Sequence, residues 1–151
     1  MIDFGLSEEQ EALQRAAREF LARECPPALV RETAKVPDGV PRALYAKMAA
    51  LGWMGLVVPE AGGGLGLSTL DLALVLEELG RAAAPGPFLP TQLVIHALLR
   101  AGSAAQRTAW LPRLVAGVEG IRTVRNPEAR ADRGESAGAS GLRTEIGRAH
   151  V

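Results

Sequence analysis

The sequence is poor in cysteine: among 151 residues there is one, Cys25. A single thiol excludes an internal disulfide and any metal site built from several cysteines. This scarcity is typical of proteins from a reducing compartment, and the favoured role of Cys25 is that of a small packed side chain. A small secreted fold held together by internal disulfides is therefore excluded.

Net charge and long hydrophobic runs are also lacking. Seventeen basic residues balance seventeen acidic ones, so the overall charge gives no attraction to nucleic acid or to an anionic membrane. The longest strongly apolar run, residues 93–99, is far shorter than the roughly 20 residues that span a bilayer. Residues 1–10 lack the basic start and apolar stretch of a secretory signal. We therefore expect a cytoplasmic protein with no nucleic-acid and no membrane partner.

What the sequence does have is helical periodicity. Ser7 and Ser103 each precede a glutamine by three residues, which is capping-box spacing, and Ser68 is a further candidate cap. Prolines and glycines separate the patterned segments. The predicted helices span about 7–24, 28–35, 41–51, 68–80, 91–100 and 103–117. Residues 1–117 are therefore predicted to form one all-α domain, an irregular, roughly orthogonal bundle of about six helices with short connections.

Two of these helices are unusually apolar. Residues 69–79 carry apolar side chains on almost every side, and a helix of that composition is expected to be buried all round. Residues 91–100 form a second nearly all-apolar helix, which Gly102 ends. In the last helix, Pro112 is expected to cause a kink, because proline removes a backbone hydrogen bond.

Residues 118–151 differ from the rest of the chain. They contain few large apolar residues, many arginines, and scattered glycine and serine, without a sustained helical or strand period. A packed core cannot be built from this composition. The segment is therefore predicted to be a disordered tail.

Four glycines stand between residues 62 and 66, directly before an apolar helical pattern. A Walker-type phosphate loop needs a lysine, and this stretch has none. The dinucleotide-binding pattern G-x-G-x-x-G also fails, because its third glycine position falls on Leu67 or Thr69. We therefore predict a constrained loop that leads into the helix, not a phosphate site.

The polar and aromatic candidates favour structural roles. Glu77 and Glu78 are adjacent carboxylates, but adjacent helical residues point about 100° apart, so a solvated pair is favoured over an acid–base pair. His96 is expected to pack with one hydrogen-bond partner. No second histidine lies in the globular part, so no metal site and no Ser–His–Asp or Cys–His arrangement is predicted. Trp53 and Trp110 are expected to be core anchors.

Three segments resemble, in content and order, the N-terminal helical domain of acyl-CoA dehydrogenases. They are FGLSEEQEALQRAAREFLARE (4–24), LGWMGLVVPEAGGGLGLSTLDLALVLEELGRA (51–82) and GSAAQRTAWLPRLVAG (102–117). The middle segment is the most specific, through Pro59 with Glu60, the glycines and LEELGR. The resemblance covers residues 2–117. It implies that the glycine stretch is the family's loop into a central helix and shapes the acyl-binding side.

The resemblance implies a flavin-dependent enzyme that oxidises an acyl-CoA to the 2,3-enoyl-CoA. In the family a carboxylate base removes the α-proton, a hydride passes to FAD, and electrons leave through an electron-transfer flavoprotein. The flavin lies between a middle β-domain and a C-terminal helical bundle, and this sequence shows neither. No catalytic, cofactor-binding or metal-binding residue is therefore assigned, and no FAD is expected to bind this chain alone. The full-length enzyme is expected to be a homo- or heterotetramer.

The resemblance also implies that the helix after Pro90 lines the acyl cavity. This assigns Phe88, Leu89 and Leu93 as substrate-pocket candidates. Because an apolar pocket and an apolar core look alike in a sequence, the same residues are equally consistent with filling the helical core.

The family pattern is lost after Gly117, where relatives continue with a strand that ends in Thr-Glu-Pro. Residues 146–151, IGRAHV, match the translation of a string that resembles a common sequencing adapter. We therefore expect a frameshift or chimeric join near Val118 and a truncated gene fragment that is inactive alone. The alternative is a genuine short, non-catalytic helical module that binds an acyl group or a dehydrogenase subunit.

Overall fold

The computed structural model of the chain describes residues 5–36 and 39–117. Within these ranges the protein has six α-helices, two short 3-10 helices and no β-strand, which confirms the predicted all-α class. The α-helices are α1 (Glu8–Glu24), α2 (Pro27–Ala34), α3 (Arg42–Ala50), α4 (Thr69–Arg81), α5 (Phe88–Ala101) and α6 (Ala104–Val115). The 3-10 helices are η1 (Trp53–Gly55) and η2 (Glu60–Gly62). The tail predicted at 118–151 lies outside the described residues.

Three helices begin with reciprocal capping boxes. The Ser7 hydroxyl accepts a hydrogen bond from the backbone N–H of Gln10 at 3.2 Å, and the Gln10 side chain accepts one from the backbone N–H of Ser7 at 3.1 Å. Ser103 has the same arrangement with the glutamine three positions on, as predicted. The predicted cap Ser68 is also confirmed, and Asp71 completes its box. These bonds satisfy N–H groups that have no partner within a helix.

One helix that contains a proline begins earlier than predicted, and another continues through its proline as predicted. α5 begins at Phe88, three residues before the predicted start at Thr91. Pro90 lies in the first turn of α5, where the backbone N–H has no acceptor within the helix, so proline sacrifices no hydrogen bond there. α6 continues through Pro112 to Val115. Pro112, where a kink was expected, therefore does not end the helix.

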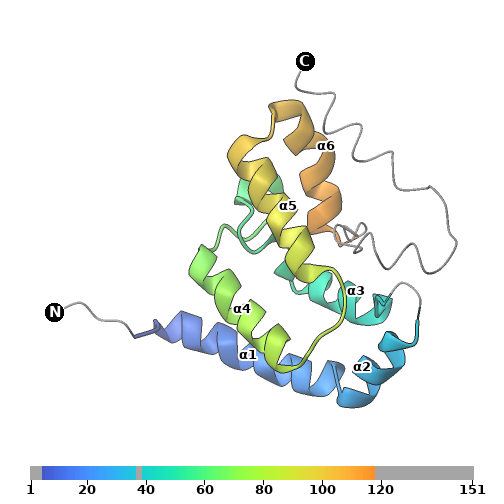
Figure 1. Ribbon diagram of the computed structural model, residues 1–151. Coiled ribbons are helices and arrows are strands. Elements are labelled where there is room, and N and C mark those ends of the chain that lie inside the picture. Colours follow the sequence, from blue (N-terminus) through green and yellow to red (C-terminus); the bar gives the residue numbers. More distant parts are fainter. Residues whose placement is uncertain (1–4, 37–38, 118–151) are drawn as a thin grey trace, which may run out of the picture.

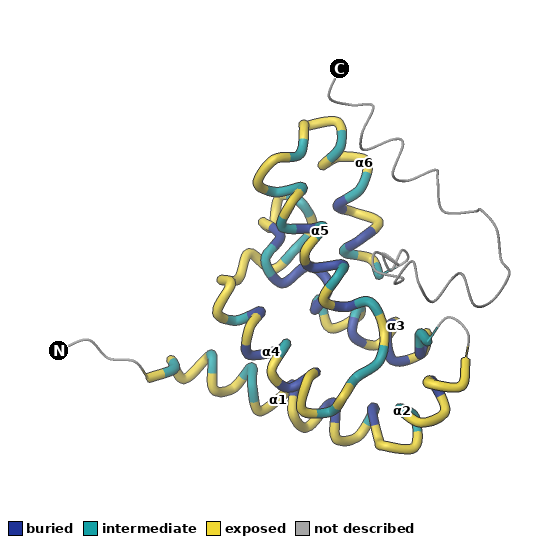
Figure 2. Tube along the Cα trace, in the orientation of Figure 1, coloured by how far each residue is buried: buried dark blue, intermediate teal, exposed yellow. Residues whose placement is uncertain are grey.

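The helices pack as two pairs joined by η1. α1 lies along α4, and α5 packs beside α6 (Figure 1). Between them, η1 contacts α3, α5 and α6. Gln92 of α5 is buried and donates a hydrogen bond from Nε2 to the carbonyl oxygen of Met54 at 3.1 Å. The buried residues concentrate where the helices face one another, so η1 lies at the centre of the fold (Figure 2).

The glycine stretch is a constrained loop, as predicted. Gly63 and Gly66 have φ angles of +82° and +64°, a region that favours glycine. A Cβ at Gly64 would lie 2.1 Å from the carbonyl oxygen of Val58, so any side chain there would overlap the backbone. The loop folds against its own chain, with the Leu67 N–H donating to Leu56 at 2.8 Å. Its glycines therefore allow the loop backbone to lie directly against the backbone of residues 55–58.

α4 is not buried on all sides, and that expectation is wrong. Leu72, Val75 and Leu79 are buried, whereas Leu70 is half-exposed and Ala73 is exposed. Among the described residues, α1 covers one side of α4 and no element covers the side that carries Leu70. The apolar composition of α4 therefore exceeds what this part of the chain can bury.

Candidate functional site

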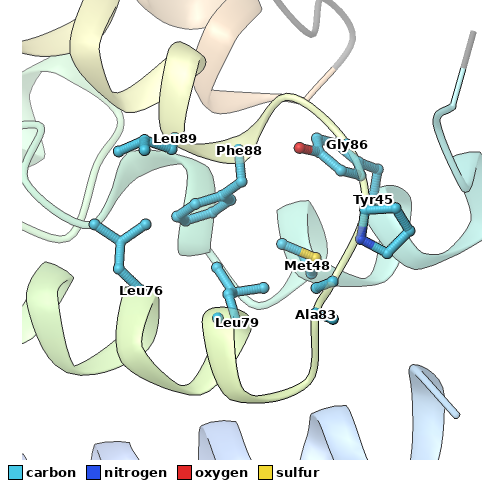
Figure 3. A pocket seen from close by; sticks show the side chains of 11 residues that line it. Tyr45, Met48, Leu76, Leu79, Ala83, Gly86, Phe88 and Leu89 are labelled. Carbon is cyan, nitrogen blue, oxygen red and sulfur yellow. The ribbon is translucent and has the colours of Figure 1, made fainter. Parts of the chain in front are cut away.

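An apolar cavity of about 220 Å³ lies where α3, α4 and α5 meet. Residues 82–87, here called the strap, join α4 to α5 and form one wall (Figure 3). The helical walls are Tyr45 and Met48 of α3, Leu76 and Leu79 of α4, and Phe88 and Leu89 of α5. The volume exceeds that of an apolar cavity of roughly 150 Å³ that holds a benzene molecule. The site can therefore take a compact hydrocarbon group.

The strap follows the end of α4 closely. The backbone N–H groups of Ala82, Ala83 and Ala84 donate to the carbonyl oxygens of the last turn of α4 at 2.9–3.0 Å. Ala83 has a φ of +48°, which an L-residue adopts only where its surroundings hold it. The chain then turns at Gly86, whose φ is +117°. The hydrogen bonds anchor the first half of the strap, residues 82–84, to the end of α4.

Two of the three predicted pocket residues line the cavity. Phe88 is buried in its inner wall, and Leu89, which is 51% exposed, stands at its rim. Leu93 is 63% exposed and does not line the cavity, although it follows Leu89 by one helical turn. Phe88 also belongs to the buried core, so pocket and core share this residue. Whether these side chains contact an acyl group remains a prediction.

Tyr45 is a cavity residue that the sequence patterns did not single out. The side chain is 6% exposed, and its hydroxyl has no hydrogen-bond partner among the described residues. Burial raises the pKa of Tyr45 above its ordinary value, so the hydroxyl stays protonated at neutral pH. The sequence offers one signal that could have identified it: Tyr45 is a lone tyrosine within the apolar face of α3, and a buried phenol normally has a hydrogen-bond partner.

Glu77 and Glu78 have different environments, and the expectation of a solvated pair is wrong for Glu78. Glu77 is 54% exposed, whereas Glu78 is 1% exposed. Arg18 of α1 donates two hydrogen bonds to Glu78, at 2.8 and 3.1 Å, and Arg81 lies 3.3 Å from the same carboxylate. The hydrogen bonds from Arg18 hold the pKa of Glu78 below its usual value. Because α1 packs over α4, Glu78 ties the two helices together.

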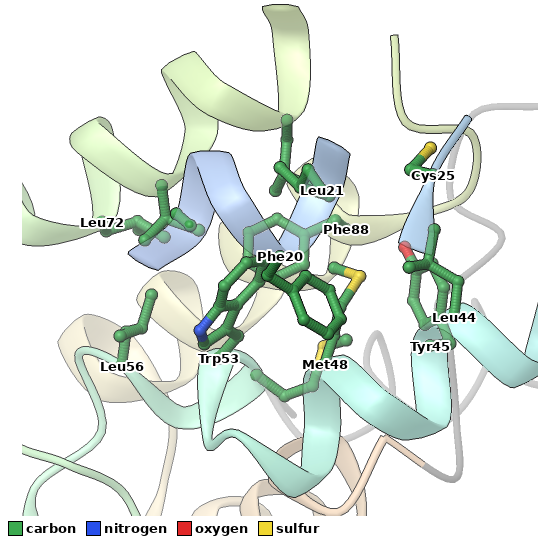
Figure 4. Packing of buried hydrophobic residues seen from close by; sticks show 14 residues of the cluster. Phe20, Leu21, Cys25, Leu44, Tyr45, Met48, Trp53, Leu56, Leu72 and Phe88 are labelled. Atoms are coloured by element: carbon green, nitrogen blue, oxygen red, sulfur yellow. The ribbon is translucent and has the colours of Figure 1, made fainter. Parts of the chain in front are cut away.

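The remaining candidates have structural roles. Nδ1 of His96 lies 3.1 Å from the carbonyl oxygen of Gln92, which matches the single partner expected for this histidine. Trp53 is buried and meets Phe20 edge-on at a centroid distance of 5.0 Å (Figure 4). Trp110 is partly buried and carries the Arg113 guanidinium 5.1 Å above its ring, so it is less enclosed than expected.

The described residues offer no fit for a metal ion or for FAD. No cluster of three or more histidine, cysteine or acidic residues occurs among them. The cavity presents no basic side chain to a pyrophosphate, and at about 220 Å³ it is below the roughly 300–1,000 Å³ of ordinary ligand pockets. None of the described helices is long and apolar enough to cross a membrane.

The sequence matches a known family over most of its length. Residues 7–118 match the model of "Acyl-CoA dehydrogenase, N-terminal domain". A curated relative, acyl-CoA dehydrogenase IpdE2 of Mycolicibacterium smegmatis, is 36% identical over 124 residues, which cover 82% of this chain and 39% of that protein. The chain spans about a third of the length of the curated relatives it matches.

Solved structures give the same result. A variant of the Tcur3481-Tcur3483 steroid ACAD is 34% identical and has a TM-score of 0.68, covering 73% of this chain and 30% of that one. An acyl-CoA dehydrogenase from Bacillus anthracis, complexed with FAD, is 26% identical with a TM-score of 0.61, covering 79% and 20%. The fold of the described residues is thus shared with solved acyl-CoA dehydrogenases. The chain belongs to the acyl-CoA dehydrogenase family and contains its N-terminal helical domain.

Proposed function

We propose that this chain supplies the acyl-binding side of a flavin-dependent acyl-CoA dehydrogenase. The observation that carries the proposal is the apolar cavity that Phe88 and Leu89 line together. Family membership supports the reaction class, dehydrogenation of an acyl-CoA between its α and β carbons with hydride transfer to FAD. The reaction of the whole protein stays a proposal, since the chain spans about a third of its relatives.

The proposed role of the cavity is to bury and position the acyl group. Its lining side chains are hydrocarbon apart from the Tyr45 hydroxyl and the Met48 sulfur, so each methylene that enters gains about 0.8 kcal/mol from leaving water. Phe88 closes the inner end, and Leu89 flanks the entrance. We assign no catalytic residue in this chain, and we propose that FAD is bound by the full-length enzyme and not by this chain alone.

The proposed setting follows from the family resemblance. The substrate is an acyl-CoA, and the electron acceptor is an electron-transfer flavoprotein. The full-length enzyme is proposed to be a homo- or heterotetramer in the cytoplasm, with no nucleic-acid or membrane partner. The balanced charge and the lack of a membrane-length helix among the described residues are compatible with this setting.

Titration with octanoyl-CoA and with free CoA tests the acyl-binding role. We expect the chain to bind octanoyl-CoA more tightly than CoA, because only the former brings a hydrocarbon group to the cavity. Replacing Leu89 with Asp places a charge at the rim and is expected to weaken octanoyl-CoA binding at least tenfold, since desolvating a carboxylate is costly. Calorimetry or fluorescence of Trp53 and Trp110 gives the affinities.

Leu51 provides a matched control, because it is 49% exposed, close to the 51% of Leu89, and lies outside the cavity. Leu51→Asp is expected to leave octanoyl-CoA binding unchanged. Equal affinity for octanoyl-CoA and CoA, or equal loss in both variants, contradicts the proposal.

An independent long read of the gene through the codon for Val118 and past Val151 separates an enzyme fragment from a short non-catalytic module.

A further inference from the structure

The Tyr45 hydroxyl is a buried polar group without a partner among the described residues. Its side chain is more than nine-tenths buried. Leaving such a group unpaired has a free-energy cost of about 1–3 kcal/mol. Buried hydroxyls in folded proteins nearly always have a protein, water or ligand partner. An unpaired phenol that borders a cavity therefore calls for a partner from outside the described chain.

Tyr45 belongs to the wall of the cavity between α3, α4 and α5, and its hydroxyl oxygen lies covered behind that wall. Every other lining residue is Met, Leu, Ala, Gly, Pro or Phe. Among the described lining residues, Tyr45 thus carries the one side-chain hydroxyl, and no lining side chain is an amide or a charged group. Figure 3 shows the hydroxyl pointing from α3 toward Phe88, beside the strap. Among the described lining side chains, the one hydroxyl therefore lies directly beside an otherwise apolar cavity.

A single glycine covers this donor. A Cβ on Gly86 would lie 2.5 Å from Cε2 of Tyr45 and 3.1 Å from its hydroxyl oxygen. Gly86 itself is exposed, and no side chain of its own stands over the phenol. The backbone of Gly86 is thus what stands next to the hydroxyl, and the hydrogen bond proposed below requires this backbone to move outward.

We propose that Tyr45 is a specificity-determining residue whose hydroxyl donates a hydrogen bond to a carbonyl oxygen on the acyl group that occupies the cavity. The inference rests on the proposed acyl-binding function. It assigns the substrate class as an acyl-CoA whose acyl group carries an oxo group away from the thioester. An all-hydrocarbon acyl group leaves the hydroxyl unpaired and is bound less well.

Two probes of the same shape test the donor directly. Cyclohexanone and methylenecyclohexane differ in one terminal atom group, C=O against C=CH₂, and a six-membered ring suits the cavity volume. Both are titrated by NMR against the full chain and against Tyr45→Phe. We expect Tyr45→Phe to weaken cyclohexanone binding about two- to tenfold relative to methylenecyclohexane, the effect of one neutral hydrogen bond.

Thr33→Val is the matched control, because Thr33 is also buried and lies outside the cavity. It is expected to leave the ratio of the two affinities unchanged. If both probes bind and the ratio is the same in the wild type and Tyr45→Phe, the role of Tyr45 is overturned while the acyl cavity stands. If neither probe binds the wild-type chain, the cavity is not a ligand site, and both the role of Tyr45 and the proposed function fail.

Discussion

At Gly86 the absence of a side chain decides how the strap lies against α3. The residue has a φ of +117°, and an added Cβ would overlap the Tyr45 ring. We expect Gly86→Ala to destabilise the fold by at least about 1–3 kcal/mol from backbone strain, with the overlap adding to the loss. Urea unfolding followed by circular dichroism measures the free energy of unfolding.

Gly80 is the control for this change, since it also lines the cavity but lies within α4, where an added Cβ would meet open space. Gly80→Ala is expected to leave stability unchanged or to raise it by up to about 1 kcal/mol, because alanine favours the helix. Equal losses in the two variants would show that the cavity wall resists any added methyl group, irrespective of φ.

Glu78 makes stability depend on pH. Its pKa is lowered in the folded state by hydrogen bonds from Arg18, so its contribution is complete above the unfolded value of about 4.5. As the pH falls below that value, the unfolded state takes up the proton first and the contribution is lost. We expect Glu78→Gln to lower Tm by several degrees at pH 7 and by progressively less between pH 5 and pH 3.

Glu77→Gln provides the comparison on the adjacent residue. Glu77 is exposed and pairs with Arg81 at 2.9 Å, an arrangement that contributes little in water. Its Tm is expected to stay within about a degree of the wild type at each pH. A Glu78→Gln loss that stays constant with pH indicates that packing, rather than charge, joins α1 to α4.

At the scale of the elements, local chemistry predicted most of the fold. Capping residues such as Ser7 and Ser103 mark helix starts because they satisfy backbone groups within four residues, which a sequence shows directly. The start of α5 was less predictable, since Pro90 suits either a turn or a first helical turn. The burial of Glu78 was missed because it depends on Arg18, which lies 60 positions away in the chain.

The cap of α4 gives a prediction at this scale. Ser68→Ala removes the acceptor for the Asp71 N–H and one partner of the Asp71 carboxylate, whose pKa is lowered chiefly by its hydrogen bond from the Ser68 side chain. We expect a loss of about 1 kcal/mol in the free energy of unfolding. The neighbouring change Thr69→Ala affects an exposed first helical residue and is expected to stay within about 0.5 kcal/mol of the wild type. Urea unfolding of both variants measures the difference.

At the scale of the whole molecule, the candidate site was predictable in part. The family resemblance identified Phe88 and Leu89, because the order of the motifs fixes which helix comes after α4. It did not distinguish Leu93, which is also an apolar residue of α5 but lies outside the cavity. Tyr45 and Gly86 were not found, since their meeting joins α3 to the strap across some 40 residues and leaves no local pattern.

The exposed leucines indicate that the chain alone associates. Leu65 and Leu67 are exposed in the loop before α4, Leu70 is exposed in the first turn of α4, and Leu89 and Leu93 are exposed on α5. Large exposed apolar side chains favour contact with another protein surface when they lie close together. We expect sedimentation equilibrium to show self-association of the wild-type chain at micromolar concentrations, and a monomer for the double variant Leu70→Ser with Leu93→Ser.

The matched control is the double variant Val36→Ser with Leu51→Ser, which removes two equally apolar, half-exposed side chains outside α4 and α5. If any exposed hydrocarbon sufficed, both double variants would reduce association equally. If the leucines of α4 and α5 form the contact, the control variant associates as the wild type does. A monomeric wild-type chain contradicts both alternatives and indicates that these leucines are too dispersed to bind a second copy.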